Sequence, residues 1–201
     1  KGESVLELKQ QGFKNSLNHF ESLLHAVSSN RFFLDYLKES TPQNYQNSID
    51  TFCTVVQSDQ RIMQLRYLDE TGQERIRIDR TETDALPVRV EGDALQDKSR
   101  RDYFIESSNN SAGQLYISKL DLNIEHGKIE VPYTPVLRFA LPVFEKRKRR
   151  GIVIVNIFME VTLQELVASE LFHLYLYDNG NCLLYSNDPA YSNWERYLDQ
   201  P

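Results

Sequence analysis

Residues 62–79, IMQLRYLDETGQERIRID, carry the clearest structural pattern in this sequence. In the first half, Met63, Leu65 and Tyr67 alternate with their neighbours, and the two isoleucines of the second half alternate with charged residues. The central DETG supplies turn residues, and Gly72 adopts a positive φ without steric cost. Alternation with a period of two on both sides of a turn predicts an antiparallel hairpin of half-buried strands.

Two longer strands are predicted further along the chain, at residues 135–144 and 151–158. The connecting EKRKRR at residues 145–150 is charged and predicts a solvated turn. The second strand is apolar on both faces except for Asn156, which predicts a central strand covered on both sides. Shorter strands are expected on either side of Lys119, where the alternation changes phase and a bulge or strand end is predicted.

The first 38 residues carry a helical pattern. An apolar stripe recurs every seven residues, at Leu6, Phe13, Phe20 and Val27. The SSN sequence at residues 28–30 predicts an interruption before the pattern resumes. Two interpretations of the stripe stay open: it packs on its own domain, or it forms a stalk that pairs with a second copy of the chain.

Further helices are predicted from capping residues. Thr41 followed by proline marks the start of a helix that precedes the hairpin. Asp93 is expected to cap a helix over residues 93–104. Thr162, with a glutamate three residues later, is expected to cap a helix over residues 160–171.

Residues 172–187, FHLYLYDNGNCLLYSN, repeat the order of strand, aspartate turn and strand found in residues 62–79. This internal echo predicts two modules of one type. We therefore expect an α+β chain in three parts. They are an N-terminal stalk helix over residues 1–40, a sheet module over residues 41–160, and a linker helix with the start of a smaller, incomplete module over residues 161–201. In this last part a short helix is expected around Trp194 and Tyr197, after the second hairpin.

The composition excludes several classes of protein. With 40% hydrophobic and 26% charged residues, the 201-residue chain is an ordinary globular sequence. Its net charge of -6 argues against nucleic acid as a partner. No apolar run approaches the ~20 residues of a membrane span. The chain starts at Lys1 inside a helical pattern, so residue 1 is expected to be an experimental cut or a processing site, which could lie just after a membrane span. The two cysteines, Cys53 and Cys182, are expected to be free thiols.

Four blocks of the sequence resemble, in the same order, the membrane-distal module of double Cache sensor domains. These are PAS-like extracytoplasmic domains of bacterial histidine kinases, diguanylate cyclases and chemoreceptors. The blocks are LRYLDETGQERIRIDR, LQDKSRRDYF, LYISKLDLNIEHGKIEVPYTPVLRFALPVF and RGIVIVNI. The later YLYDNGNCLLYSND and NWERYL resemble the opening of the membrane-proximal module. The resemblance covers about residues 5–200, and the later strands of the proximal module are missing from this sequence.

The resemblance implies a fold and a mode of action. It implies a long N-terminal helix that continues out of a transmembrane helix, and a five- or six-stranded antiparallel sheet. A ligand pocket is expected on one face of that sheet, roofed by the helix and loop between the second and third strands. Ligand binding is expected to shift the stalk and the proximal module, and so to change a cytoplasmic output domain.

Polar side chains interrupt apolar strand faces at several places and supply candidate site residues. A buried charge is costly unless it is paired, so an arginine within a strand needs a carboxylate from the protein or from a ligand. We expect a ligand site built from Arg66, Lys98, Tyr103, Tyr116, Ser118, Asp121 and Arg138. The alternative is a set of scaffold ion pairs, in which Arg66 pairs with Asp121 or Glu125 and Arg138 pairs with Asp69.

The residue types point to an acidic ligand. Two arginines and Lys98 favour a carboxylate held by charge-assisted hydrogen bonds, which predicts a small organic acid or an amino acid. Residues 121–127 depart from a calcium loop because their glycine is displaced by one position, and the four histidines lack metal-site spacing. We expect no metal, no cofactor and no catalytic residues, so this chain is not expected to be an enzyme.

The expected function is small-molecule sensing outside the cytoplasm for a bacterial histidine kinase or diguanylate cyclase. The chain is expected to be periplasmic, anchored in the inner membrane, and dimeric through its N-terminal helix. A population shift between two stalk arrangements would carry the signal. The alternatives are a chemoreceptor sensor domain and a ligand-free module that recognises a periplasmic protein.

Overall fold

The computed structural model describes residues 2–125, 128–191, 193–194 and 198 of the 201-residue chain. The chain divides into two compact units. The larger unit comprises residues 17–158, and the smaller one combines Lys1–Ser16 with Met159–Pro201. The long helix α1 (Gly2–Ser28) therefore contributes its first half to the smaller unit and its second half to the larger one.

An antiparallel sheet of seven strands forms the centre of the larger unit, in the order β3-β2-β1-β9-β8-β4, with β5 also paired to β8. The strands are β1 (Ile62–Leu68), β2 (Glu74–Asp79), β3 (Val88–Arg89), β4 (Tyr116–Ile117), β5 (Asp121–Leu122), β8 (Pro135–Glu145) and β9 (Lys148–Phe158). The predicted hairpin, the two long strands and the break near Lys119 are confirmed. A separate two-stranded sheet joins β6 (Ile124–Glu125) to β7 (Lys128–Ile129).

A bulge near the start of β1 corrects one detail of the predicted alternation. The register between β1 and β9 shifts between Ile62 and Gln64. Met63 therefore packs with Val136 and Phe158 rather than on the face that carries Leu65. An extra residue in one strand reverses the side-chain alternation locally, which the sequence pattern did not reveal.

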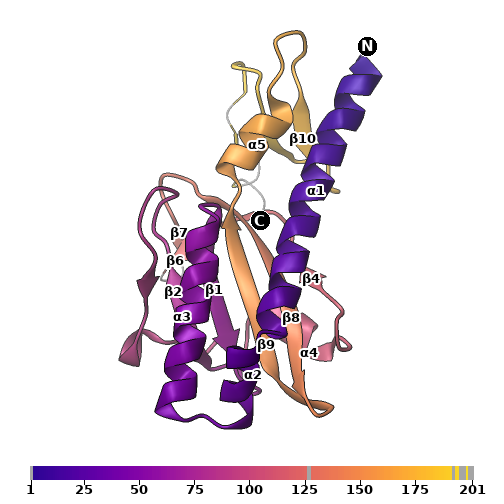
Figure 1. Cartoon of the computed structure of the whole chain (residues 1–201). Helices are drawn as coiled ribbons and strands as arrows, with labels where there is room; N and C mark the ends of the chain where they lie inside the picture. The colour runs from indigo at the N-terminus through magenta and orange to yellow at the C-terminus, as the bar shows by residue number, and fades with distance from the viewer. Residues whose placement is uncertain (1, 126–127, 192, 195–197, 199–201) are drawn as a thin grey trace. The chain divides into compact units, whose positions relative to one another are not determined.

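Helices cover one face of this sheet. α2 (Arg31–Lys38) and α3 (Pro42–Ser58) follow α1 and lie across β1 and β8 (Figure 1). The Thr41 hydroxyl accepts a hydrogen bond from the N–H of Asn44 and caps α3, as predicted. The SSN sequence separates α1 from α2, and the Asn30 side chain caps α2.

Aromatic rings fill the space between these helices and the sheet. The ring of Phe33 lies 5.1 Å from that of Tyr67 and 5.3 Å from that of Phe52. The ring of Phe20 lies 5.7 Å from that of Phe139. Within the larger unit, Phe20 and Val27 are buried at 0% and 2% exposure, so these two stripe residues are not available to a second copy of the chain.

The opposite face of the sheet carries α4 (Asp102–Asn109). Tyr103 and Phe104 of this helix pack on an apolar cluster from the strands, which comprises Leu68, Ala140, Ile152 and Ile154. The predicted helix over residues 93–104 is wrong. A short 3-10 turn, Gly92–Ala94, is followed by extended chain because the backbone groups of residues 96 and 98 hydrogen-bond to the start of β2 and the turn before it.

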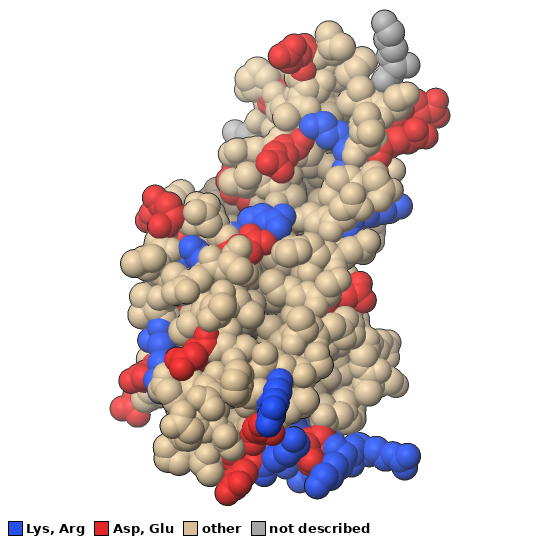
Figure 2. Space-filling view, viewed as in Figure 1, with Lys and Arg blue, Asp and Glu red and all other residues tan. Residues whose placement is uncertain are grey.

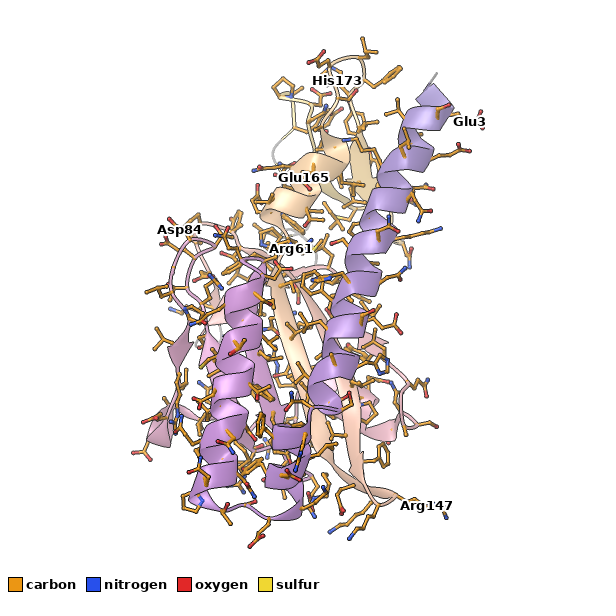
Figure 3. All side chains as sticks on the ribbon, in the orientation of Figure 1. Glu3, Arg61, Asp84, Arg147, Glu165 and His173 are labelled. Atoms are coloured by element: carbon orange, nitrogen blue, oxygen red, sulfur yellow. The ribbon has the colours of Figure 1, made fainter. Side chains whose placement is uncertain are left out.

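The charged turn between β8 and β9 is solvated, as predicted. Lys146 and Arg147 adopt left-handed φ angles of 46° and 67°, and the Lys146 side chain is 86% exposed. Figure 2 shows Lys and Arg side chains gathered at the lower edge of the view, where Arg147 extends away from the hairpin in Figure 3. Glu70 lies within 3.5 Å of Lys148 and 3.9 Å of Arg150.

The smaller unit contains the first half of α1, helix α5 (Glu160–Val167) and the hairpin of β10 (Tyr175–Tyr177) with β11 (Leu183–Ser186). α5 begins after Met159, so the predicted cap at Thr162 is wrong. The second hairpin is confirmed and reuses the turn chemistry of the first. Asp178 Oδ1 accepts from the backbone N–H groups two and four residues later, as Asp69 Oδ1 does in the first hairpin.

The described residues also bear on the membrane span, the cysteines and the C-terminal helix. No helix among them combines the length and apolar character needed to cross a bilayer. Cys53 and Cys182 are free thiols, as predicted. The short helix predicted around Trp194 and Tyr197 falls mainly outside the described residues.

Candidate ligand-binding site

Polar side chains form a row across three neighbouring strands on the face opposite the helices α1 to α3. The strand register places Gln64 of β1 opposite Asn156 of β9, and Asn156 opposite Arg138 of β8. Arg66 lies two residues along β1 on the same face and is directly opposite Arg77 of β2. Sheet pairing therefore brings three arginines from three strands to one face.

Residues 92–101, called here the roof segment, close over this face. The N–H of Glu74 donates to the carbonyl of Gln96 at 3.0 Å, and the N–H of Lys98 donates to the carbonyl of Gly72 at 2.8 Å. Gly72 has a φ of 89°, and a Cβ there would lie 2.5 Å from the Cα of Ser99. A glycine is required at this turn because the roof segment packs directly on its backbone.

An inner cavity of about 170 Å³ lies between the strand face and the roof segment. Its lining is dominated by cationic and amide side chains. The residues are Gln64, Arg66, Arg77, Gln96, Lys98, Arg101, Tyr103, Asn123, Ile124, Arg138 and Asn156. No carboxylate occurs among the described residues of this lining, which makes the cavity suited to an anion.

Arg66 is the best-enclosed cation of the inner cavity, with a side chain only 4% exposed. Its Nη2 donates to Oδ1 of Asn156 at 2.9 Å, and its Nη1 donates to Oε1 of Glu74 at 3.2 Å. Its Nε is buried and has no hydrogen-bond partner among the described residues. A buried unpaired donor is costly, so this N–H is available to an acceptor that enters the cavity.

Arg138 and Lys98 are also incompletely neutralised. Among the described residues, the carboxylate paired with Arg138 is that of Asp121, whose Oδ2 is 3.9 Å from Nη1, and the guanidinium donates no hydrogen bond there. Burial lowers the pKa of Arg138, and the positive charge of Arg66 lowers it further. Burial likewise lowers the pKa of Lys98 from its ordinary 10.5. Both groups would gain from a bound negative charge.

Tyr103 connects α4 to the cationic floor. Its hydroxyl accepts a hydrogen bond from Nη1 of Arg66 at 3.4 Å. Its ring centroid lies 5.4 Å from the guanidinium carbon of Arg66 and 5.9 Å from that of Arg101. These cation–π contacts hold both guanidinium groups near the ring without neutralising them.

A more open outer cavity of about 680 Å³ shares four residues with the inner one: Arg101, Tyr103, Ile124 and Arg138. The remaining residues of its lining carry both signs of charge. They are Arg100, Asp102, Glu106, Tyr116, Ile117, Ser118, Lys119 and Asp121. Burial raises the pKa of Tyr116, and the carboxylates of Asp102 and Glu106 raise it further.

The seven predicted site residues are distributed over both cavities. Arg66 and Lys98 line the inner cavity, whereas Tyr103 and Arg138 line both. The other three line only the outer cavity: Tyr116, Ser118 and Asp121. The Ser118 hydroxyl also takes part in the pairing of the chain with β8, because it accepts a hydrogen bond from the N–H of Arg138 at 3.0 Å.

The alternative set of scaffold ion pairs had the wrong partner for Arg66. That arginine pairs with Glu74 rather than Asp121, while nothing is described for the Glu125 side chain. The alternative was also wrong for Asp69, whose carboxylate pairs with Arg75 at 2.6 Å. These pairings depend on the turn between β1 and β2, which places Glu74 and Arg75 close to residues eight and six positions earlier.

The predicted set omitted several lining residues. Arg77 could have been found, because hairpin pairing places it opposite Arg66. Gln64 and Asn156 were visible as polar interruptions of apolar strands. Gln96 and Asn123 carry no such sequence signal, since each lies in an irregular segment.

No group of three metal-ligating side chains occurs among the described residues. Part of the calcium-like segment, residues 126–127, lies outside that description. In the described part, Oδ1 of Asp121 accepts from the N–H of Leu122 at 2.8 Å, and Nδ2 of Asn123 donates to Oε2 of Glu130 at 3.2 Å. The Asp121 carboxylate thus contacts the local backbone as well as Arg138, and the Asn123 amide contacts the Glu130 side chain.

Solved structures with the same fold are sensory domains. The domain of a putative sensory box/GGDEF family protein from Vibrio parahaemolyticus has a TM-score of 0.81 at 23% identity, covering 92% of this chain and 70% of its own. The extracellular domain of the putative histidine kinase vpHK1S-Z8 has a TM-score of 0.81 at 23% identity, covering 93% and 67%. At these identities the likeness establishes the fold alone.

A chemoreceptor domain shares the fold more distantly. The sensory domain of the Campylobacter jejuni chemoreceptor Tlp3 has a TM-score of 0.71 at 16% identity, covering 95% of this chain and 74% of its own. The same domain has been solved with isoleucine bound. A search of curated proteins found no match.

The family comparison goes further than the fold. The model for the sensor domain of bacterial histidine kinases matches residues 1–175, which is most of the chain. This agrees with the double Cache resemblance of the sequence blocks and with the α+β fold around a PAS-like antiparallel sheet. A sensor domain of this kind is not itself catalytic. The chain belongs to the family of bacterial histidine kinase sensor domains.

Proposed function

We propose that the inner cavity binds a small organic anion, and that the chain is the extracytoplasmic ligand-binding region of a membrane-anchored signalling protein. The observation that supports this most strongly is an excess of positive charge around the inner cavity. Five cationic side chains line the inner cavity, namely Arg66, Arg77, Lys98, Arg101 and Arg138. The three buried arginines share three described carboxylates, those of Glu74, Asp79 and Asp121. Lys98, which is half-buried, and Arg101, which is exposed, have no described carboxylate partner, so two positive charges of the lining stay unmatched.

A buried charge is expensive when it is poorly paired, as that of Arg138 is. A carboxylate in the inner cavity would accept from Nε of Arg66, which has no described partner, and from the guanidinium of Arg138. Charge-assisted hydrogen bonds of this kind are about twice as strong as neutral ones. The cavity is thus arranged for a ligand that supplies the missing negative charge.

An acid without an ammonium group fits the inner cavity best, because no described carboxylate lines it. An amino acid is the second candidate. Asp121 lines the outer cavity beside Arg138, which lines both cavities. If the carboxylate of an amino acid bound Arg138, its ammonium group would lie near the carboxylate of Asp121. The isoleucine bound by the Tlp3 domain makes an amino acid a reasonable member of any test panel.

A ligand-free module that recognises a periplasmic protein is the rival interpretation. It predicts a hollow filled by the chain's own side chains, together with an exposed apolar patch. The cavity of about 170 Å³ and its polar lining favour the small-molecule interpretation. We also propose that the full protein carries a kinase or cyclase output domain, which the family model and the two most similar structures reported above support.

Signal transfer would use a population shift. A ligand changes the balance of two arrangements only by as much as its affinity differs between them. Helix α1 contributes to both units and is the natural carrier of such a change. We propose that the chain dimerises through the N-terminal half of α1, where Leu6 of the apolar stripe is 49% exposed.

The proposal is tested by thermal unfolding with matched pairs of ligands at constant ionic strength. Succinate with aspartate, and propionate with alanine, differ by one ammonium group. A ligand at a hundred times its Kd stabilises by about 2.7 kcal/mol, which raises the Tm by about 5–10 °C in a chain of this size. We expect the acids to exceed their amino partners. If no anion in a wider panel raises the Tm, the inner cavity is not a ligand site.

A further inference from the structure

Two arginines that line the inner cavity, Arg66 and Arg77, donate hydrogen bonds to the same carboxylate, that of Glu74. Its side chain is 0% exposed. Oε1 accepts from Nη1 of Arg66 at 3.2 Å, and Oε2 accepts from Nη1 of Arg77 at 3.4 Å. The two arginines lie directly opposite each other on β1 and β2, where like charges destabilise strand pairing. Glu74 offsets this repulsion.

The two ion pairs of Glu74 are long for their type. Charge-assisted N–H···O bonds are typically about 2.7–2.9 Å. Arg77 has such bonds with Asp79, at 2.6 Å from Nη2 and 2.9 Å from Nε. Arg77 is therefore held mainly by Asp79. Arg66 has no comparable carboxylate among the described residues, and its Nε is unpaired.

The same carboxylate also holds the roof segment. Oε2 of Glu74 accepts from the N–H of Gln96 at 3.0 Å, and the N–H of Glu74 donates to the carbonyl of Gln96 at 3.0 Å. The side chains of Gln96 and Lys98 line the inner cavity beside this contact. Glu74 thus joins the cationic floor to the segment that covers it.

We propose that Glu74 is a positioning residue that competes with the bound anion for Arg66 while its other oxygen holds the roof segment on β2. The inference rests on the proposed function, because it takes the inner cavity as an anion site. In the unliganded chain Glu74 neutralises Arg66. When an anion takes over Arg66, Glu74 keeps its contacts with Arg77 and Gln96, so the roof segment stays attached to β2.

This role has a consequence that a purely structural role lacks. Glu74→Gln keeps the shape of the side chain but removes one negative charge and replaces one of the two acceptor oxygens with an amide donor. The remaining oxygen is expected to hold the N–H of Gln96, so that Arg66 loses its charged acceptor. The unliganded variant is expected to be less stable, since it leaves two buried arginines with less neutralisation. Its affinity for anions is expected to rise about tenfold, because one fewer negative charge opposes the ligand at short range.

The experiment measures anion affinity by calorimetric titration of wild type, Glu74→Gln and Asp79→Asn. The probes are sodium sulfate and any organic acid to which the wild type responds, at constant ionic strength. Asp79→Asn is the matched control, since it also removes one negative charge that pairs with Arg77. In its described hydrogen bonds the Asp79 side chain contacts neither Arg66 nor the roof segment. We expect the control to change affinity by less than about threefold.

Each outcome has a distinct meaning. A gain in Glu74→Gln that exceeds the gain in Asp79→Asn supports the competition. Equal gains, no gain, or a loss in Glu74→Gln overturns it, even when the wild type binds anions. If the wild type and both variants bind neither sulfate nor any acid, the proposed function itself fails.

A second pair of variants covers the case in which Glu74→Gln does not fold. Arg77→Gln is compared with the double variant Arg77→Gln and Glu74→Gln, in which the charge of the cluster equals that of the wild type and Arg77 no longer needs a partner. We expect the double variant to bind sulfate at least about fivefold more tightly than Arg77→Gln alone. Equal affinities would overturn the proposal.

Discussion

The two faces of the central sheet are formed by the same strands but differ in how well their buried side chains are packed or paired. On β8, Phe139 faces the helices α1 to α3 and is 0% exposed, with its ring against that of Phe20. Its neighbour Arg138 faces the inner cavity and is 7% exposed, without a hydrogen bond from its guanidinium to a described residue. Both side chains are buried, but only the first is satisfied by its surroundings.

This difference separates stability from function. The helix face is closely packed with apolar and aromatic groups, so its residues contribute to the free energy of unfolding. The cavity face keeps positive charges that the protein only partly neutralises, which lowers stability. Such a cost persists in natural proteins where activity depends on it. Substitutions on the two faces should therefore have opposite profiles.

The largest expected effect on stability comes from the helix face. Phe139→Ala removes a fully buried ring and leaves a cavity, which is expected to lower the free energy of unfolding by about 3–5 kcal/mol. Urea unfolding measures the loss. The anion response per folded molecule should persist at a temperature where the variant is folded. A loss below about 1 kcal/mol would contradict the close packing of this face.

Two buried arginines sharpen the comparison. Arg80 is 5% exposed, and its guanidinium donates to backbone carbonyls, including that of Ile62 at 3.2 Å and that of Ala85 at 2.8 Å, as well as that of Val56. Arg80→Met is expected to cost about 2–4 kcal/mol because it leaves buried carbonyls unsatisfied. The anion response should remain.

Arg138→Met is expected to show the reverse profile. Its free energy of unfolding should stay within about 1 kcal/mol of the wild type, or rise, because an apolar side chain of similar length replaces a poorly paired buried charge. Its anion-dependent rise in Tm should disappear. If Arg138→Met unfolds as readily as Arg80→Met, then Arg138 is a scaffold residue and the difference between the faces is lost.

The smallest expected effect is a pH dependence from Lys98. Its pKa in the folded chain lies below the ordinary 10.5 because of burial. Between the lowered pKa and 10.5 the unfolded chain binds the proton more readily, so the stability of the unliganded protein should rise with pH. Anion affinity should fall over the same range as Lys98 loses its charge.

Lys98→Met serves as the control for that pH dependence. The difference between wild type and variant isolates Lys98 from the other groups that titrate at high pH. Urea unfolding and anion titration across the alkaline range give the two slopes. Slopes that are the same in wild type and variant would show that Lys98 does not contribute charge to the cavity.

Local sequence patterns predicted most of the strands and helices because their causes are local. The Asp69 turn, the cap at Thr41 and the alternation around Tyr67 each depend on residues a few positions apart. The errors occurred where distant contacts prevail. The roof segment is extended rather than helical because its backbone hydrogen-bonds to β2 and the preceding turn, and the bulge at Met63 reverses one side chain.

The candidate site was only partly visible for the same reason. Arg66 and Arg138 were identifiable as charges within apolar strands. Their grouping with Lys98 around one cavity depends on the register of four strands and the course of the roof segment. The separation of Tyr116, Ser118 and Asp121 into an outer cavity has no counterpart in any sequence pattern.

The order of residues along the chain established the class of fold, the hairpins with their aspartate turns and the presence of arginines in apolar strands. These features follow from side-chain periodicity and turn chemistry, which act over a few residues. Folding in three dimensions established which carboxylate meets Arg66, where the roof segment attaches and how large the cavity is. Such features depend on contacts between strands far apart in the chain, where packing and charge pairing are settled together.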